Sequence, residues 1–506
     1  MVELVSFEES MERLVRFVEE TTPDTIVEQT VDLLDQGESA KRLLKAAGLA
    51  VSRSTELPSS HHGGPIHPIA GLYSTFRLSE RLEGRNAFMP TLQSVALANR
   101  HIHSPEMGPA AMVAIDADDL LNKDVQDLTQ GFESALRNRS GAIAEKHLLA
   151  LLAVASRDQI LEALLQIAIP RNALDDHYFL YVVCAFRALD AIGWDHASVI
   201  LRPTVRFLVR HPMMEHGDDE RGRIIGEGVA LYLNYADLEG LVDGHGIAPD
   251  TIEFETGPEE SDAIDRLAQR IAMAAAITEA PRYMAAAMIE GLSIMGTLEA
   301  ASIGGARRFM RSNSGNPFDV HLQTGINARR YLLGCDGLSR RTKLLALLSW
   351  GYGYEVRHID RTLHWSLESD AAVPESGAEH DQDEMLAAIT ASIAKQPILN
   401  LDQLEESIAV LVAPDSVRET IALTAHYIAL GHDADALFAR LAELVCHDDQ
   451  SEMHAYKEQQ TAHEEYHATR EAFRAVHLLA AVKHMAVIGP IRPQNIYARV
   501  RSSLNS

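Results

Sequence analysis

The sequence predicts an all-α fold, and two features of its apolar pattern support this prediction. Apolar residues recur every three or four positions through most of the 506 residues, as in "HLLALLAVASRDQILEALLQIAI" from His147 onward. Alternating β-branched runs bounded by turns, which are typical of strands, are scarce. Hydrophobic residues make up 46% of the chain, which is enough to bury a large core.

The first segment, residues 1–20, is predicted to be an acidic amphipathic helix, because its apolar residues recur at helical spacing among glutamates. It lacks the basic and apolar regions of a secretory signal peptide. The chain also contains no run of about 18 apolar residues, the length that a membrane-spanning helix needs. We therefore expect a cytoplasmic protein.

Acidic residues dominate the charge of the chain. The 45 Lys and Arg residues against 72 Asp and Glu residues give a net charge of −27, and no basic stripe is present. Nucleic acid and anionic membranes are therefore poor partners, and a small molecule is the expected one. Three widely spaced cysteines, Cys184, Cys335 and Cys446, suit neither a disulfide framework nor a thiolate zinc site. Any metal must use nitrogen and oxygen ligands.

Four segments resemble one another when they are aligned by eye, and they begin at Ile66, Asp176, Val320 and Met453. Each carries a histidine at its start, continues as one helix, turns, and enters a second apolar helix. Another helical stretch precedes each segment. This pattern predicts a helical-repeat array, with about four helices in each unit, that can close into an α/α ring around a central pocket.

Two stretches without helical periodicity interrupt the array. An acidic connector, residues 246–265, separates a first helical half, residues 1–245, from a second, residues 266–506. Within the second half, residues 368–384 carry seven carboxylates and no Lys or Arg. This composition predicts a solvated linker or surface loop.

The four segments place their histidines in the first turn of a helix: His67 and His177 in the first half, His321 and His454 in the second. If the array closes, equivalent helix starts converge and deliver four imidazoles to one cavity. The positive end of a helix dipole disfavours imidazolium, so the rings should stay neutral, the form that binds a metal. The shared register therefore predicts a metal site, although a single histidine at a helix start is often only a capping or packing residue.

Side chains near these histidines supply further candidates. Three acidic neighbours can cap a helix or orient an imidazole ring; they are Asp176, Asp319 and Glu452. One turn along the helices, Tyr181, Lys457 and Glu458 are candidates for proton transfer or substrate contact. The residues four and seven positions after each histidine are mostly small or polar, which predicts a ligand cavity; they are Gly71, Ser74, Tyr181, Cys184, Gly325, Ala328, Glu458 and Thr461.

Other histidines leave alternatives open. His61 and His62, in a Gly/Pro loop, can add ligands or face solvent, and we favour solvent. The run "HEEYH", residues 463–467, matches the H-E-x-x-H zinc motif, with Glu464 as the base and either His477 or Glu471 as a third ligand. Against this motif, a second glutamate lies inside it and no G-x-x-H continuation follows.

Several quoted segments resemble the helix-initial histidine segments of questin oxidase-like proteins: "IHPIAGLYSTFRL", "FDVHLQTGINARRYLL" with "KLLALLSW", and "MHAYKEQQTAHEEYH" with "AVHLLAAVKH". The segment "DDHYFLYVVCAFRALDAIGWDHASVILRPTVRFLV" is similar to bacterial all-α proteins, some of them fused to Rieske-type domains. The resemblance covers about residues 60 to 490. It implies an oxygenase that cleaves an aromatic polyketide ring in a Baeyer-Villiger-like oxidation with a nicotinamide reductant. Only His67, His177, His321 and His454 carry over.

The chain itself has no nicotinamide fingerprint and no Rieske cysteine-histidine pairs, so electrons from NAD(P)H would come through a redox partner. We therefore expect a metal-dependent oxidoreductase, a monooxygenase-like enzyme with an aromatic or polyketide-like substrate. Iron is the favoured metal and zinc the alternative. The competing functions are a zinc-type metallohydrolase that uses "HEEYH" and a non-catalytic helical-repeat scaffold.

Overall fold

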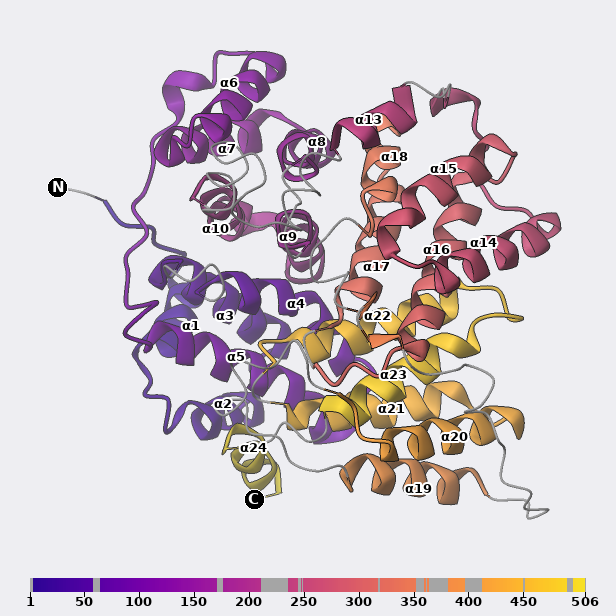
Figure 1. The fold of residues 1–506 in the computed structure, drawn as a ribbon. Coiled ribbons are helices and arrows are strands. Elements are labelled where there is room, and N and C mark those ends of the chain that lie inside the picture. Colours follow the sequence, from indigo (N-terminus) through magenta and orange to yellow (C-terminus); the bar gives the residue numbers. More distant parts are fainter. Residues whose placement is uncertain are drawn as a thin grey trace.

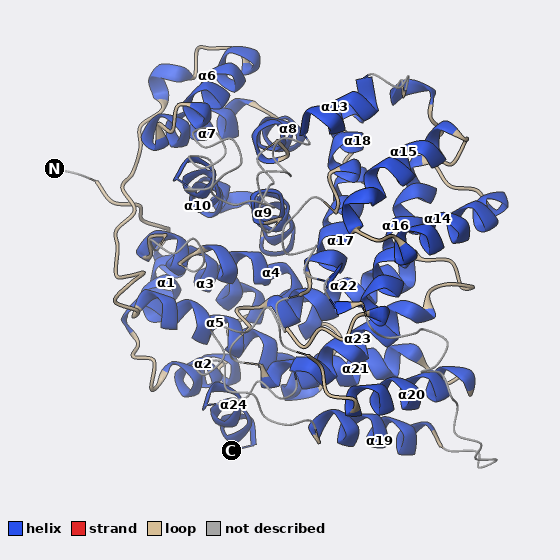
Figure 2. Ribbon diagram, viewed as in Figure 1, coloured by secondary structure: helices blue, strands red, loops and turns tan. Residues whose placement is uncertain are grey.

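Helices build the described part of this computed structural model, and no strand occurs in it (Figure 1 and Figure 2). The only β-type pairings there are two isolated bridges, Leu4 with Val113 and Ser314 with Val412. The predicted all-α fold is therefore confirmed. The structure describes residues 3–57, 64–170, 176–210, 235–243, 247, 249–316, 319–351, 359–360, 362–363, 381–395, 412–448, 451–488 and 495–505.

The α-helices of the first part of the chain are α1 (Glu9–Glu20), α2 (Ile26–Asp35), α3 (Ala40–Ser54), α4 (Ile66–Ser79), α5 (Met89–Ile102), α6 (Val125–Arg137), α7 (Gly141–Val154), α8 (Arg157–Ala168), α9 (His177–Ile192) and α10 (Ala197–Arg210). Short 3-10 turns also occur here at η1 (Gly84–Phe88), η2 (Asp118–Leu120) and η3 (Trp194–His196).

The second part contains α13 (Tyr235–Asp243), α14 (Ser261–Met273), α15 (Ala280–Ile289), α16 (Ile294–Arg311), α17 (His321–Leu333), α18 (Arg340–Leu348), α19 (Gln382–Ala394), α20 (Ser416–Ala429), α21 (Ala434–Leu444), α22 (His454–Ala468), α23 (Ala475–Ile488) and α24 (Asn495–Asn505). Its short 3-10 turns are η4 (Pro249–Thr251), η5 (Pro258–Glu260), η6 (Ile277–Glu279) and η10 (Val445–His447).

Four helices meet near the centre of the view in Figure 1. Helix α4 packs against α9 and α22, and α17 packs against the same two helices. Two of the four come from the first half of the sequence and two from the second, so the halves share this core. Buried apolar side chains on these and the surrounding helices form one continuous core.

The two predicted breaks in the helical pattern differ from the structure at their edges. The last residues of the predicted acidic connector, 261–265, belong to α14. The backbone N–H groups of Ile294 and Met295, at the start of α16, donate to the carbonyls of Glu253 and Phe254 in that connector (2.9 and 3.0 Å). The connector therefore supplies acceptors for two backbone N–H groups in the first turn of α16, which have no partner within the helix. In the predicted acidic loop, residues 382–384 form the first turn of α19, and residues 368–380 lie outside the described part.

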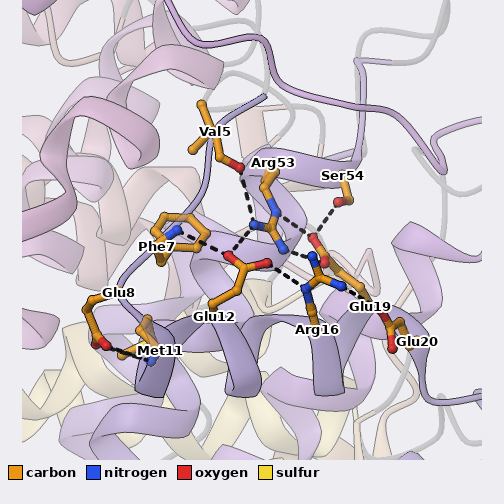
Figure 3. Close-up of polar contacts among 10 residues, drawn as sticks. All are labelled: Val5, Phe7, Glu8, Met11, Glu12, Arg16, Glu19, Glu20, Arg53 and Ser54. Carbon is orange, nitrogen blue, oxygen red and sulfur yellow. Dashed lines mark hydrogen bonds and ion pairs between the residues drawn. The ribbon is translucent and has the colours of Figure 1, made fainter. Parts of the chain in front are cut away.

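A buried arginine joins the first helix to the core (Figure 3). Arg53, near the end of α3, donates to Glu12 (2.7 Å) and to both oxygens of Glu19 (2.9 and 2.6 Å) on α1. Ser54 also donates to Glu19, at 2.5 Å. The guanidinium thus neutralises two carboxylates that α1 turns toward the core, which explains why this acidic helix packs stably.

At the other end of the chain, α24 packs against α2 and α5. Arg499 of α24 forms a bidentate pair with Glu28 of α2 (2.9 and 2.6 Å), so the last described helix is fastened to one of the first. Within the described ranges, no helix combines the length and the apolar character that crossing a bilayer requires.

Candidate metal centre

The four helix-initial histidines lie together in the core. Ring centroids are 5.6 Å apart for His67 and His177, and 4.7 Å for His177 and His321. They are 5.3 Å apart for His321 and His454, and 5.0 Å for His454 and His67. All four side chains are buried. Nitrogen atoms of His67, His177 and His454 lie within 4.8 Å of one another, close enough for one metal ion to bind all three.

Local structure explains this convergence. Helices α9, α17 and α22 begin at their histidines, and α4 begins one residue before His67. The residues that precede His177 and His454, Asp176 and Met453, adopt the left-handed conformation (φ 61° and 67°), which turns the chain sharply into each helix. Four helix N-termini therefore face the cluster, and their partial positive charges disfavour imidazolium.

Hydrogen bonds at Nδ1 orient two of the rings. His67 donates from Nδ1 to Glu452, and His454 donates from Nδ1 to the carbonyl oxygen of Ser451 (2.6 Å). Each ring thereby keeps its proton on Nδ1 and turns the lone pair of Nε2 away from that partner, as metal-binding histidines do. Burial lowers the pKa of His67, although Glu452 opposes this shift, and burial lowers the pKa of His454 well below its usual value. Both rings are therefore neutral at pH 7.

The acidic neighbours take three different roles. Glu452 precedes His454 in the chain but orients His67, the histidine whose own segment offers no acid. Burial raises the pKa of Glu452, but His67 and His101 outweigh it and lower the value to about 2. Asp176 makes no side-chain capping bond and pairs with the buried Arg329 (3.1 and 3.2 Å). The capping role considered for Asp176 is therefore wrong.

The third acid, Asp319, accepts hydrogen bonds from Ser314 and from the side-chain amide of Asn316 (3.2 Å). Asp319 therefore links Ser314 and Asn316 to the residues just before His321.

Tyr181 contacts two of the four histidines. Its hydroxyl lies 2.9 Å from Nε2 of His67, and its ring stacks on His177 with the centroids 4.8 Å apart and an angle of 10° between the planes. Because Nδ1 of His67 donates to Glu452, Nε2 is the acceptor and the tyrosine hydroxyl is the donor. Tyr181 therefore holds a proton directly beside the histidine cluster.

A cavity of about 20 Å³ lies next to the histidine cluster and is lined by residues further along the same four helices. Residues three positions and seven positions after each histidine line it, so all four helices turn the same face toward it. These residues are Ala70 and Ser74, Leu180 and Cys184, Thr324 and Ala328, and Lys457 and Thr461; His177, Tyr181, Tyr73, Arg187 and Gln460 complete the lining. The volume suits about one water molecule. A larger ligand enters only if lining side chains change rotamer.

The residues that line the cavity differ from the predicted ones at the position four residues after each histidine. Ser74, Cys184, Ala328 and Thr461, seven residues after the histidines, line the cavity, but of the four residues at the fourth position only Tyr181 does. Gly71 and Gly325 make room for protein: a Cβ on Gly71 would meet Met453 at 2.6 Å, and one on Gly325 would meet Asp176 at 2.6 Å. Each glycine thus receives the residue before a histidine of a neighbouring helix.

Lys457 and Glu458 lie in different surroundings. Lys457 lines the cavity and is 7% exposed, so it brings an amine to a possible ligand. Glu458 is fully buried outside that lining, and neither of its oxygens has a hydrogen-bond partner in the described part of the chain. Burial raises its pKa well above the usual value, which favours the neutral carboxylic acid.

A polar clamp closes the opposite end of the cavity, and no motif in the sequence predicted it. Glu464 accepts hydrogen bonds from Arg187 (2.6 Å), Tyr73 (2.6 Å) and Gln460 (2.8 Å). The guanidinium of Arg187 also lies over the ring of Tyr73, 3.9 Å from its centroid. Burial raises the pKa of Glu464, but Arg187 and these donors outweigh it and lower the value. The motif "HEEYH" had singled out Glu464 as a catalytic base, but no sequence signal paired it with Arg187 or Tyr73.

The two histidines of "HEEYH" lie on another face of α22. His463 and His467 approach Asp435, with Nε2 to Oδ1 distances of 3.6 and 2.9 Å. The three residues form a second potential metal-binding group, which is partly exposed. In this group Asp435, rather than His477 or Glu471, lies beside the two histidines. His61 and His62 lie outside the described residues.

No protein-family model, curated protein or solved structure matches the chain. The questin oxidase-like resemblance therefore stays a prediction, and the function has to be inferred from the geometry of the site.

Proposed function

We propose that the chain is a metal-dependent oxidoreductase, an oxygenase that acts on a small aromatic or polyketide-like molecule. One observation carries the proposal: nitrogen atoms of three buried histidines from three helices lie within 4.8 Å of one another, with His321 beside them. One metal ion held by several of these nitrogens at once would account for their close approach in the core.

The ligand set suits a first-row transition metal. Imidazole binds iron, copper, nickel and zinc well, whereas magnesium and calcium prefer oxygen ligands. His67, His177 and His454 would hold the ion, and His321 is placed to act as a fourth ligand. Iron, when bound, would supply the redox chemistry that oxygen activation needs. The electrons would come from NAD(P)H through a separate redox partner.

Residues of the chain would prepare the substrate. Tyr181 donates to Nε2 of His67, and a metal ion on that nitrogen would displace this hydrogen bond. The hydroxyl would then be available to serve an oxygen atom of the substrate as a general acid. Lys457 at the cavity would attract a phenolate or carboxylate group, since it brings positive charge to a site away from bulk water, whereas the charge of Arg187 is already paired with Glu464. The tyrosine rings offer faces for an aromatic substrate.

The metallohydrolase alternative receives less support from the geometry. A catalytic base must be able to reach a water molecule bound beside the two histidines of the motif. The carboxylate of Glu464 is instead occupied by Arg187, Tyr73 and Gln460. The scaffold alternative predicts no metal dependence, so metal analysis separates it from the oxygenase.

The test is metal content and oxygen uptake. Wild-type protein should contain about one iron per chain in the buried site, and His177→Ala should lose it while circular dichroism stays helical. His321→Ala tests the fourth ligand and should weaken metal binding. His147→Ala removes a buried histidine of α7, outside the cluster, and should keep the metal. Glu464→Gln should also keep it, because Glu464 is no ligand in this proposal.

Loss of iron from His177→Ala together with reductant-dependent oxygen uptake by wild type would support the oxygenase. Full iron occupancy in both His177→Ala and His321→Ala would show that the buried histidines hold no metal, and the proposal would then fail.

A further inference from the structure

The start of α21 and the last turns of α22 bring three possible ligands together at the surface. His463 and His467 are four residues apart on α22, so they lie on one helix face, with ring centroids 4.6 Å apart. Asp435, in the first turn of α21, reaches them from the neighbouring helix. Its Oδ1 atom lies 2.9 Å from Nε2 of His467 and 3.6 Å from Nε2 of His463.

These distances match a shared metal ion. Zinc binds histidine nitrogen and carboxylate oxygen at about 2.0 to 2.2 Å, so two ligands of one tetrahedral or octahedral ion lie roughly 3 to 3.5 Å apart. The distances from Oδ1 of Asp435 to Nε2 of His467 and His463, 2.9 and 3.6 Å, lie close to the lower and upper ends of that range. Only small side-chain rotations, two of them of exposed residues, would therefore be needed to place all three donors around one ion.

We propose that His463, His467 and Asp435 form a second divalent-metal site, of the zinc type, at the surface and separate from the buried histidines. Two imidazoles and one carboxylate suit zinc better than the oxygen-binding calcium and magnesium ions. The remaining coordination positions face solvent, because Asp435 and His467 are exposed. This inference does not depend on the oxygenase proposal.

The site has a structural role in this proposal. Glu464, the base of an H-E-x-x-H hydrolase, points to the Arg187 clamp, so the two histidines keep their metal-binding spacing without the catalytic group. A metal ion there would join the first turn of α21 to the last turns of α22. Asp433 caps α21 by accepting from the backbone N–H of Asp435 (3.0 Å), which already orders that turn. Metal binding should therefore raise thermal stability rather than supply activity.

A simpler explanation is a charge-assisted hydrogen bond between Asp435 and His467 with no metal. The experiment that separates the two uses full-length protein without a histidine tag, stripped with a chelator and dialysed against micromolar Zn²⁺. Bound zinc is counted by mass spectrometry, and melting temperature is recorded with and without Zn²⁺. The variants are His463→Ala/His467→Ala and Asp435→Asn. His103→Ala, an exposed histidine on the C-cap of α5, is the matched control.

The expected result is that both site variants bind one zinc fewer than wild type and lose most of the zinc-dependent rise in melting temperature, whereas His103→Ala behaves as wild type. His177→Ala should keep the surface zinc. If the surface variants bind as much zinc as wild type, the site does not exist. If only the buried histidines hold no metal, wild type binds a single zinc and the surface variants bind none, so the two failures give different counts.

Discussion

Glu452 orients His67, although it stands two residues before His454 in the chain. At the scale of single residues, contacts between residues of different helix segments hold the site together. Asp176, the residue before His177, pairs with Arg329 of α17, and Met453, the residue before His454, fills the space beside Gly71 of α4. His67 is thus oriented by a residue from the segment of another helix, whereas His454 is oriented by Ser451 of its own segment.

We expect a buried ion pair to contribute more to the free energy of unfolding than an exposed one. The arginines Arg53 and Arg16, both drawn in Figure 3, allow this comparison. Arg53 is 10% exposed and pairs with Glu12 and Glu19, whereas Arg16 is 63% exposed and pairs with Glu12 and Glu20. Arg53→Ala leaves Glu19 buried without its cation and removes one of the two cations beside Glu12, so we expect a loss of about 3 kcal/mol in the free energy of unfolding.

The matched change Arg16→Ala should cost much less, because water screens an exposed pair. Urea denaturation of both variants measures the difference. Similar losses for the two variants would contradict the assignment of the buried role to Arg53.

At the scale of elements, close approach between helices depends on two glycines at the same place in their helices. Gly71 in α4 and Gly325 in α17 each stand four residues after a histidine and each accept a neighbouring side chain where a Cβ would lie. A β-carbon at Gly325 would meet an oxygen of Asp176 that Arg329 already holds, so it has no easy escape. These glycines therefore set the spacing between the four central helices.

We predict that Gly71→Ala and Gly325→Ala each lower the free energy of unfolding by about 1 to 3 kcal/mol through overpacking. Gly240→Ala in α13 is the control, since a β-carbon at Gly240 would enter open space among the described residues. That change should raise stability by up to about 1 kcal/mol, because alanine favours a helix. Opposite shifts of the urea midpoint are the expected result, and a stabilised Gly325→Ala would refute the packing argument.

At the scale of the whole molecule, buried ionisable groups link stability to pH. Burial lowers the pKa of His477 to about 4, although Glu465 opposes the shift. Burial raises the pKa of Glu465 itself, but Arg330 outweighs this effect and lowers it to about 2. Both groups have depressed values in the folded state, so both favour folding at neutral pH and lose that contribution as the pH falls.

His477→Gln should make stability less dependent on pH. The unfolded chain binds a proton at His477 near pH 6.5, whereas the folded chain resists protonation until about pH 4. Wild type should therefore lose up to about 3 kcal/mol through this one group between pH 7 and pH 4, and the variant should not.

Urea denaturation at several pH values compares the slopes of the two proteins, and effects of other groups cancel in the difference. The hydrogen bond between His477 and Thr469 (3.0 Å) is lost or altered at every pH, so it shifts the whole curve rather than its slope. Parallel curves for the two proteins would show that His477 does not carry the expected pH dependence.

Sequence periodicity alone determined the helical class, since each amphipathic helix records in its own residues which face it buries. It also determined that histidines stand at the starts of α9, α17 and α22 and one residue inside α4, and that the seventh position after each lines one cavity. Periodicity could not decide whether the third or the fourth residue after each histidine lines the cavity, because both lie on the same side of the helix. The neighbouring helices decide between them.

Only the tertiary structure decided which helices are neighbours. It placed Arg187 against Glu464, Glu452 against His67, and Asp435 against His463 and His467. These pairs join residues far apart in the sequence, and no local periodicity encodes a contact between two helices. The physical reason is that a helix specifies its buried face locally, whereas the partner of that face is chosen by the packing of the whole core.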